Sequence, residues 1–293
     1  IEVIEHVKRA AGNPQLLWGK LFGQEKVLTT SGIARMNLLL HGIEDFRIVK
    51  EDTLRHPAFF EGDELARFDC VIANPPFSLD NWGEETWQSD PYGRNILGGV
   101  PPKKNADWAW VQHMYKSMNS TTGRIAVVLP QGSLFRGGAE ARIRRSFLEN
   151  DLIDCVIGMA PNLFYGTGLA PCIIILRSRK SKNRAKRVLM INAEAMFKRG
   201  RNQNTLEDSH VTEILKLYEN YQDCAGYSHV ALDSEIQEKN FNLNISLYVC
   251  SEIKINIASV SESRTRLVES YKVLEHSENA LESVFKKWGF DVE

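Results

Sequence analysis

A short apolar run ends abruptly in the stretch Asp69-Cys-Val-Ile-Ala-Asn-Pro-Pro-Phe77. The run Cys70–Ala73 predicts a short buried strand, and it stops at Asn74 because two consecutive prolines cannot continue a central strand. Open α/β sheets place their ligands at the carboxyl ends of strands. The tetrapeptide Asn74-Pro75-Pro76-Phe77 is therefore the first candidate for a functional site.

Strand-like and helix-like segments alternate on both sides of this stretch. Apolar runs predict strands at 46–49, 124–130, 152–158, 172–176 and 188–192, and 3.6-residue spacing or capping signals predict helices at 1–11, 33–42, 105–118, 139–149, 211–221 and 257–287. Several of the predicted strands are continuously apolar, which is typical of strands covered on both faces. The pattern predicts an α/β fold with a mostly parallel sheet between layers of helices.

Composition excludes several classes of protein. The 293 residues have a formal net charge of −1, from 36 basic and 37 acidic side chains, with 43% hydrophobic residues, so a folded globular chain is expected and disorder is not. No apolar stretch reaches the roughly 18 residues of a membrane span. The cysteines are scattered, with neither metal-ligand nor disulfide spacing, which indicates a cytoplasmic protein without a metal site.

The tetrapeptide suits a planar amino group such as the 6-amino group of adenine. That nitrogen is a poor nucleophile because its lone pair is delocalised into the ring. The side-chain oxygen of Asn74 and the backbone oxygen of Pro75 can each accept one N–H bond, which favours the charge that develops as the nitrogen reacts. Phe77 can stack on the base, which must be flipped out of a duplex to reach the pocket. The alternative is a proline turn that closes a strand.

Two further segments invite functional hypotheses. Residues 177–187 carry seven positive side chains, and Lys180, Lys182, Arg184 and Lys186 are candidate contacts to the DNA backbone; a solvated turn is an equal alternative. Residues 78–104 predict a long surface loop rich in Gly, Pro, Asn and Trp. With Trp82, Trp87 and Tyr92 it either closes over the flipped base or is a disordered insertion.

The chain resembles the modification subunit of type I restriction–modification systems, a DNA adenine methyltransferase. The resemblance rests on motifs in family order: Gly23-Gln-Glu25, Ala34-Arg-Met-Asn-Leu38, His41-Gly-Ile43, Asp52-Thr-Leu54, Ala73-Asn-Pro-Pro-Phe77, Asn105-Ala-Asp-Trp-Ala-Trp110, 123–131, Leu163-Phe-Tyr-Gly-Thr-Gly168 and Asn240-Phe-Asn-Leu-Asn-Ile245. It implies a Rossmann-like fold that uses S-adenosylmethionine, and it assigns catalysis to the tetrapeptide.

The same resemblance implies roles for four other residues. Glu25 corresponds to the acid that bonds the cofactor ribose hydroxyls, which agrees with the acceptor chemistry of a carboxylate. Asp52 corresponds to the acid that faces the cofactor adenine, with a turn cap as the alternative. Phe164 or Tyr165 is expected to supply a second aromatic face for the flipped base, with core packing as the alternative.

The family's glycine-rich cofactor loop has no counterpart in the sequence. The resemblance therefore implies that a first strand, this loop and a helical domain lie ahead of residue 1, and that cofactor binding by this piece alone is in doubt. The predicted division is a catalytic domain at 1–200, a connecting segment at 201–255 and a helical region for subunit contact at 256–293.

The resemblance also implies partners: double-stranded DNA, a specificity subunit, a restriction (motor–nuclease) subunit and a second copy of the chain, with no membrane. Two other functions stay open. One is methyl transfer to another planar amine or amide, such as a protein glutamine or an RNA base. The other is a non-catalytic module for clamping DNA or for assembly.

Overall fold

The computed structural model describes residues 2–250 and 260–288. The chain divides into two compact units, Ile1–Ser251 and Glu252–Glu293. Within the described residues, no helix has both the length and the hydropathy needed to cross a membrane.

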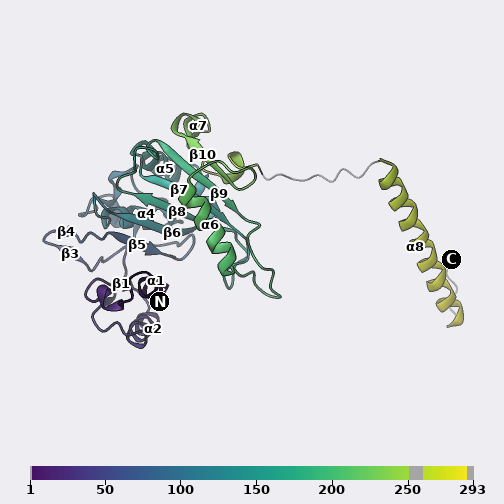
Figure 1. Cartoon of the computed structure of the whole chain (residues 1–293), viewed down its shortest axis with the longest axis horizontal. Helices are drawn as coiled ribbons and strands as arrows, with labels where there is room; N and C mark the ends of the chain where they lie inside the picture. Colours follow the sequence, from purple (N-terminus) through teal and green to yellow (C-terminus); the bar gives the residue numbers. More distant parts are fainter. Residues whose placement is uncertain (1, 251–259, 289–293) are drawn as a thin grey trace. The chain divides into compact units, whose positions relative to one another are not determined.

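A six-stranded mixed sheet organises the first unit (Figure 1). Its order is β10-β9-β7-β8-β6-β5, formed by Ser228–Leu232, Arg187–Ala193, Ile153–Met159, Pro171–Arg177, Arg124–Pro130 and Cys70–Ala73. Strands β5, β6, β7 and β9 run in one direction, and β8 and β10 run opposite to their neighbours. The predicted α/β class is confirmed, and four of the six strands share one direction; because two strands are reversed, three of the five neighbouring pairs in this sheet are antiparallel.

Helices cover the two faces of this sheet and bury separate apolar clusters. On one face, α4 (Asp107–Lys116), α5 (Ala139–Glu149) and α7 (Asp233–Glu238) pack through Trp108, Phe147 and Ile236 on alternate residues of β6, β8 and β9. On the other face, α6 (Asp208–Asn220) packs Ile214 against the alternate residues of β7 and β9. Figure 1 shows α6 on the near side of the sheet and α4 and α5 behind it.

Shorter elements complete the unit. They are α1 (Glu2–Ala11), β1 (Phe22–Glu25), α2 (Leu28–Leu40), β2 (Arg47–Lys50), β3 (Phe60–Glu61), β4 (Glu64–Leu65), α3 (Glu84–Trp87) and the 3₁₀ turns Pro14–Leu17, Arg94–Ile96, Gln131–Leu134 and Ile245–Leu247. Strand β10 pairs with β9, so residues 228–232 of the predicted connecting segment belong to the main sheet. The second unit contains α8 (Val260–Lys287).

Strand β5 lies at an edge of the sheet, which corrects the prediction of a buried strand. It pairs with β6, and among the described residues no strand pairs with its other side. Cys70 is exposed and Ile72 keeps 60% of its surface accessible. The short sequence run is the same for an edge strand and a central strand, because burial depends on which neighbours the strand acquires.

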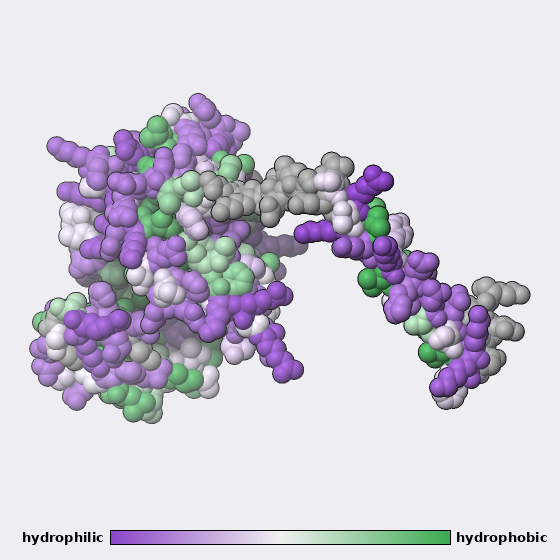
Figure 2. Space-filling view, turned by 45° about the vertical axis from the view of Figure 1, so that its right-hand side comes forward, coloured by the Kyte–Doolittle hydropathy of each residue, from purple (hydrophilic) through white to green (hydrophobic). Residues whose placement is uncertain are grey.

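Strands β1 and β2 form a separate parallel pair, and the adjoining α2 presents an apolar surface to solvent. Leu28, Ile33, Met36 and Leu40 of α2 are all more than half exposed. Figure 2 shows hydrophobic residues gathered at the lower end of the first unit. Exposed apolar area of this kind marks an interaction site.

Residues 78–104 are folded, which corrects the expectation of an open loop or a disordered insertion. Trp82 and Trp87 are 2% and 0% exposed and pack with Leu54 in a cluster of their own. Arg94 is buried with Asp90 at 2.7 Å and donates from Nη1 to the carbonyl of Leu54 at 3.0 Å. The two tryptophans are core residues, so they are not available to stack on a base.

Gly98 and Gly99 offer a matched test of how this segment packs. Both have positive φ, but a Cβ on Gly98 would lie 2.4 Å from Cα of Ile143, whereas one on Gly99 meets nothing within 4 Å. We expect Gly98→Ala to lower the free energy of unfolding by about 1–3 kcal/mol more than Gly99→Ala does, measured by urea denaturation. Equal losses in the two variants would contradict this packing.

Candidate active site

The sheet topology brings the tetrapeptide and the glycine-rich turn together. Strand β5 ends at Ala73, which pairs with Val127 of β6, and β8 begins at Pro171, which pairs with Pro130 at the carboxyl end of β6. Because β8 runs antiparallel to β6, the turn before β8 reaches the same end of the sheet as the residues after β5. Segments 74–77 and 164–169 thus meet, although about 90 residues separate them in sequence.

Together they line an open pocket of about 460 Å³, here called the tetrapeptide pocket. Its lining residues are Asn74, Pro75, Pro76, Phe77, Phe164, Thr167 and Leu169. Asn74 is exposed, and its side chain makes no hydrogen bond to residues 2–250 or 260–288 that the structure describes, whereas Pro75 is buried. An uncommitted amide on a rigid backbone can accept and donate hydrogen bonds to a ligand.

Two aromatic rings lie at the wall of this pocket. The rings of Phe77 and Phe164 are 6.0 Å apart between centroids and nearly perpendicular, with an interplanar angle of 88°. Tyr165 does not line the pocket and is 91% exposed. Of the two aromatic residues predicted for base stacking, the structure therefore brings Phe164 to the tetrapeptide.

Sequence reasoning missed two lining residues, Thr167 and Leu169. They stand in and just after the turn 164–168, which was singled out for its glycines and aromatic residues. Only their position next to Asn74 in space could have identified them. That position depends on β8, which lies between β6 and β7 and runs antiparallel to both.

The predicted cofactor residues lie at the ends of neighbouring parallel strands, Glu25 at the end of β1 and Asp52 just after β2. Glu25 is the last residue of β1 and pairs with Lys50 at the end of β2, two residues before Asp52. Glu25 Oε1 accepts the N–H of Val27 at 2.7 Å, at the start of α2. Its other oxygen has no hydrogen bond to the described residues, so the carboxylate keeps an acceptor for a hydroxyl group.

Asp52 is more heavily committed than Glu25. Its Oδ1 accepts the backbone N–H groups of Leu54 and Arg55 at 3.1 and 3.2 Å, and its Oδ2 lies 2.8 Å from Nζ of Lys26. Burial raises the pKa of Asp52, but the hydrogen bonds from Lys26, Arg55 and Leu54 outweigh it and leave the pKa below its usual value. Asp52 thus caps a turn, the alternative foreseen for it, and its contact with a cofactor stays a prediction.

Three of the four predicted DNA-contacting cations have partners within the protein. Lys180, whose side chain is 2% exposed, lies 2.7 Å from Asp151, and Arg184 lies 3.1 Å from the fully buried Asp154. Lys186 donates to the carbonyl of Glu149 at 3.1 Å. Burial lowers the pKa of Lys180, against the opposing effect of Asp151.

These contacts support the structural alternative for the basic stretch. A phosphate group at Lys180 or Arg184 would have to replace an existing ion pair. The net gain in the free energy of DNA binding would therefore be small. Lys182 is exposed, so its ammonium group is accessible to a phosphate. A role in contacting DNA stays a prediction for all four residues and is physically easiest for Lys182.

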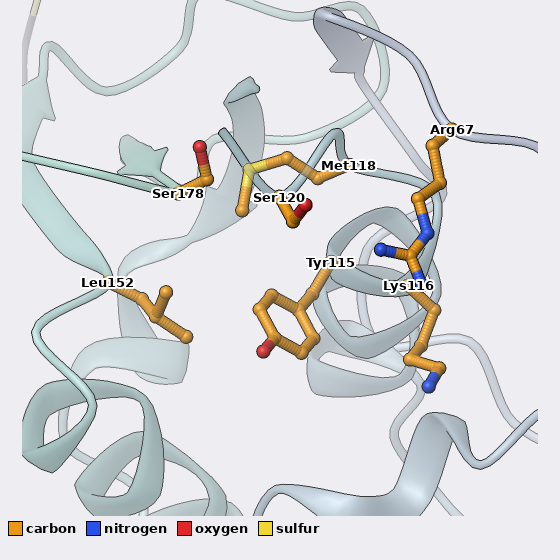
Figure 3. A pocket seen from close by; sticks show the side chains of 7 residues that line it. All are labelled: Arg67, Tyr115, Lys116, Met118, Ser120, Leu152 and Ser178. Atoms are coloured by element: carbon orange, nitrogen blue, oxygen red, sulfur yellow. The ribbon is translucent and has the colours of Figure 1, made fainter. Parts of the chain in front are cut away.

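Another hollow, of about 150 Å³, lies at the opposite end of the sheet (Figure 3). Its lining residues, Arg67, Tyr115, Lys116, Met118, Ser120, Leu152 and Ser178, stand before β5, β6 and β7 or after β8. In Figure 3 the side chains of Arg67 and Lys116 lie on the same side of the view. It contains none of the predicted site residues, and in the described part of the chain no cluster of His, Cys, Asp or Glu is arranged to hold a metal ion.

The comparisons with known proteins agree with this geometry. The family model described as N-6 DNA methylase matches residues 1–255. The chain belongs to this family. The predicted membership is confirmed, and with it the Rossmann-like methyltransferase fold.

Relatives within the family include methylase subunits of type I restriction enzymes. The MjaVII methylase subunit of Methanocaldococcus jannaschii is 37% identical over 78% of this chain and 40% of its own length. The MjaVIII subunit from the same organism is 33% identical over 92% of this chain and 48% of its own length. The chain thus spans about half the length of these relatives.

A solved structure gives the same family relationship. The crystal structure of a type I restriction–modification methyltransferase subunit from Streptococcus thermophilus matches with a TM-score of 0.75 and 37% identity. The match covers 83% of this chain and 51% of that one.

Proposed function

We propose that this chain carries the catalytic part of a type I modification subunit, which transfers a methyl group to the 6-amino group of adenine in DNA. The observation that carries the proposal is the uncommitted amide of Asn74 in a pocket of about 460 Å³ between Phe77 and Phe164. A single flipped base is the planar amine that such a pocket suits. Membership of the N-6 DNA methylase family supports the same chemistry.

Hydrogen-bond acceptors perform the main catalytic work in this proposal. Oδ1 of Asn74 and the carbonyl oxygen of Pro75 each accept one N–H of the amino group and stabilise positive charge on its nitrogen. S-adenosylmethionine, when bound, supplies an electrophilic methyl group on a sulfonium. Asn74 and Pro75 would hold the amino nitrogen while it takes up this methyl group from the sulfur, and the methylated nitrogen would then release a proton to solvent. Phe77 and Phe164 hold the base in the pocket.

The described residues supply part of a cofactor site. Glu25 would hold the ribose hydroxyls, and Asp52 would lie beside the cofactor adenine. Among the described residues, one edge of β5 is unpaired, and β1 and β2 form a parallel pair separate from the main sheet. We include in the proposal a parallel strand, followed by a glycine-rich loop, that pairs with β5 and completes the site. The exposed apolar face of α2 is part of the surface that such a segment would cover.

The proposed assembly is cytoplasmic and contains double-stranded DNA, a specificity subunit, a restriction subunit and a second copy of this chain. Helix α8 is the surface we propose for subunit contact. Leu267, Tyr271, Leu274 and Leu281 are exposed on it at spacings of three, four and seven residues. Apolar rows with this spacing pack into the grooves of partner helices.

The identity of the methylated atom tests the proposal. The full-length subunit, assembled with its specificity subunit, is incubated with S-adenosylmethionine labelled in the methyl group and with plasmid DNA. We expect the label in N6-methyladenine after digestion to nucleosides. Label in protein glutamine or in RNA supplied to the same reaction would overturn the choice of substrate, and no transfer by a folded complex would favour the non-catalytic module.

Phe164 and Tyr165 make a matched pair for testing the base-binding wall. We expect Phe164→Ala to lower the rate of methyl transfer by roughly tenfold or more, because stacking of a base on an aromatic ring is worth about 1–3 kcal/mol. Tyr165→Ala is expected to stay within twofold of the wild type, since Tyr165 is 91% exposed. A larger loss in Tyr165→Ala than in Phe164→Ala would place the base elsewhere.

A further inference from the structure

A buried carboxylate is bonded to the chain directly after the tetrapeptide. Asp107, at the start of α4, is fully buried, and its Oδ1 accepts the backbone N–H of Ser78 at 2.8 Å. The preceding residue of the helix strengthens the contact, because the N–H of Ala106 donates to the carbonyl of Leu79 at 3.1 Å. Residues 78 and 79 are thus bound to the first turn of α4.

The tetrapeptide needs such an external anchor. Pro75 and Pro76 have no backbone N–H, so neither can be held through a donor of its own. Ser78 has a φ of 50°, in the left-handed region that a non-glycine residue adopts only when its surroundings hold it there. The bond to Asp107 acts one residue after Phe77 and stabilises this conformation.

Asp107 is itself oriented by two further charged side chains. Its Oδ2 is bound by Nη2 of Arg136, and Nε of Arg136 donates to Oε2 of Glu140 at 2.8 Å. Arg136 follows β6, the strand that pairs with β5, and Glu140 is on α5 and 3% exposed. The network therefore ties the chain after the tetrapeptide to helices α4 and α5 and to the segment that follows β6.

We propose that Asp107, oriented by Arg136, is a positioning residue that fixes the direction of the Asn74 amide and the Pro75 carbonyl toward the reacting amino group. This inference rests on the proposed function and goes beyond it by adding a residue outside the tetrapeptide pocket. Asp107 touches neither the base nor the methyl donor. It acts through the backbone of Ser78, and Arg136 acts through Asp107.

Three substitutions test this role in the full-length, assembled enzyme. At saturating DNA and S-adenosylmethionine, we expect Asp107→Ala to lower the single-turnover rate by about 100-fold, because small misplacements of reacting groups have effects of that size. The KM for DNA should stay within threefold. Asp107→Asn keeps an oxygen acceptor for Ser78 and should recover to within about tenfold of the wild type. Arg136→Gln should lose about tenfold.

Asp154→Asn is the matched control for a purely structural effect. Asp154 is equally buried and bound to Arg177 and Arg184, but it lies at the start of β7, at the other end of the sheet. We expect Asp154→Asn to unfold at a lower temperature than the wild type. Below that temperature, its rate of methyl transfer should stay within twofold of the wild-type rate. Comparing the variants at equal folded fraction separates positioning from stability.

The outcomes separate this inference from the proposed function. If the wild type is active and folded Asp107→Ala methylates DNA at the same rate, the positioning role is overturned. The proposed function is not affected by that result. If Asp107→Ala does not fold, wild-type rates in both Asp107→Asn and Arg136→Gln overturn the positioning role equally. A folded wild-type complex that does not methylate adenine overturns the proposed function, and this inference with it.

Discussion

Replacing Asn74 with alanine is expected to lower the single-turnover rate of adenine methylation by about 100- to 1,000-fold, the loss typical of removing one preorganised hydrogen-bonding group. The side chain lies in the tetrapeptide pocket, is exposed, and has no hydrogen-bond partner among the described residues. Its removal therefore leaves the fold intact while the amino group loses one of its two acceptors. The measurement is a rapid-quench assay of the assembled enzyme at saturating substrates.

Two companion variants make this result specific. Asn74→Asp keeps an acceptor oxygen at this position but replaces the amide NH2 with a second oxygen and adds a charge, so its rate should lie between those of the wild type and Asn74→Ala. Asn150→Ala removes another exposed asparagine amide, one that donates to the carbonyl of Ser146 at the end of α5, and should leave the rate unchanged. A wild-type rate in Asn74→Ala, with assembly intact, would refute the assigned chemistry.

The buried ion pair in residues 78–104 carries the largest expected effect on stability. Asp90 and Arg94 are 1% and 2% exposed, and Arg94 also lies 4.2 Å above the ring of Trp87. Arg94→Met preserves much of the side-chain volume but leaves the Asp90 charge buried without its partner. We expect a loss of about 3–5 kcal/mol in the free energy of unfolding, measured by urea denaturation.

A surface pair of the same type supplies the control. Arg145 and Glu149 are 59% and 47% exposed at 2.7 Å, so Arg145→Met should change the stability by less than about 1 kcal/mol. Adding Asp90→Asn to Arg94→Met should recover part of the loss, because the buried charge is then gone. Limited proteolysis should cut Arg94→Met within 78–104 before the wild type. Equal stability of Arg94→Met and the wild type would contradict the packing described for this segment.

Local pattern was sufficient for the tetrapeptide and for most of the longer strands and helices, but β1, β10 and α7 were not predicted. Strand β6 and helix α5 have the predicted bounds, Arg124–Pro130 and Ala139–Glu149, since a continuous apolar run and a 3.6-residue period are properties of the segments themselves. The stop at Asn74 is equally local, because the two prolines end β5 wherever the strand lies. The start of α2 was predicted less well: the helix begins at Leu28 and not at residue 33, and Glu25 Oε1 accepts the N–H of Val27 just ahead of it.

Only the tertiary structure decided what each candidate residue contacts. It placed Phe164 and not Tyr165 beside Phe77, gave Lys180 and Arg184 carboxylate partners within the protein, and bonded Asp107 to the residue that follows the tetrapeptide. It also made β5 an edge strand among the described residues. Secondary structure and turns arise from residues close in sequence, whereas these contacts join segments about 30 to 90 residues apart. A sequence pattern does not specify which distant group will lie opposite a given side chain.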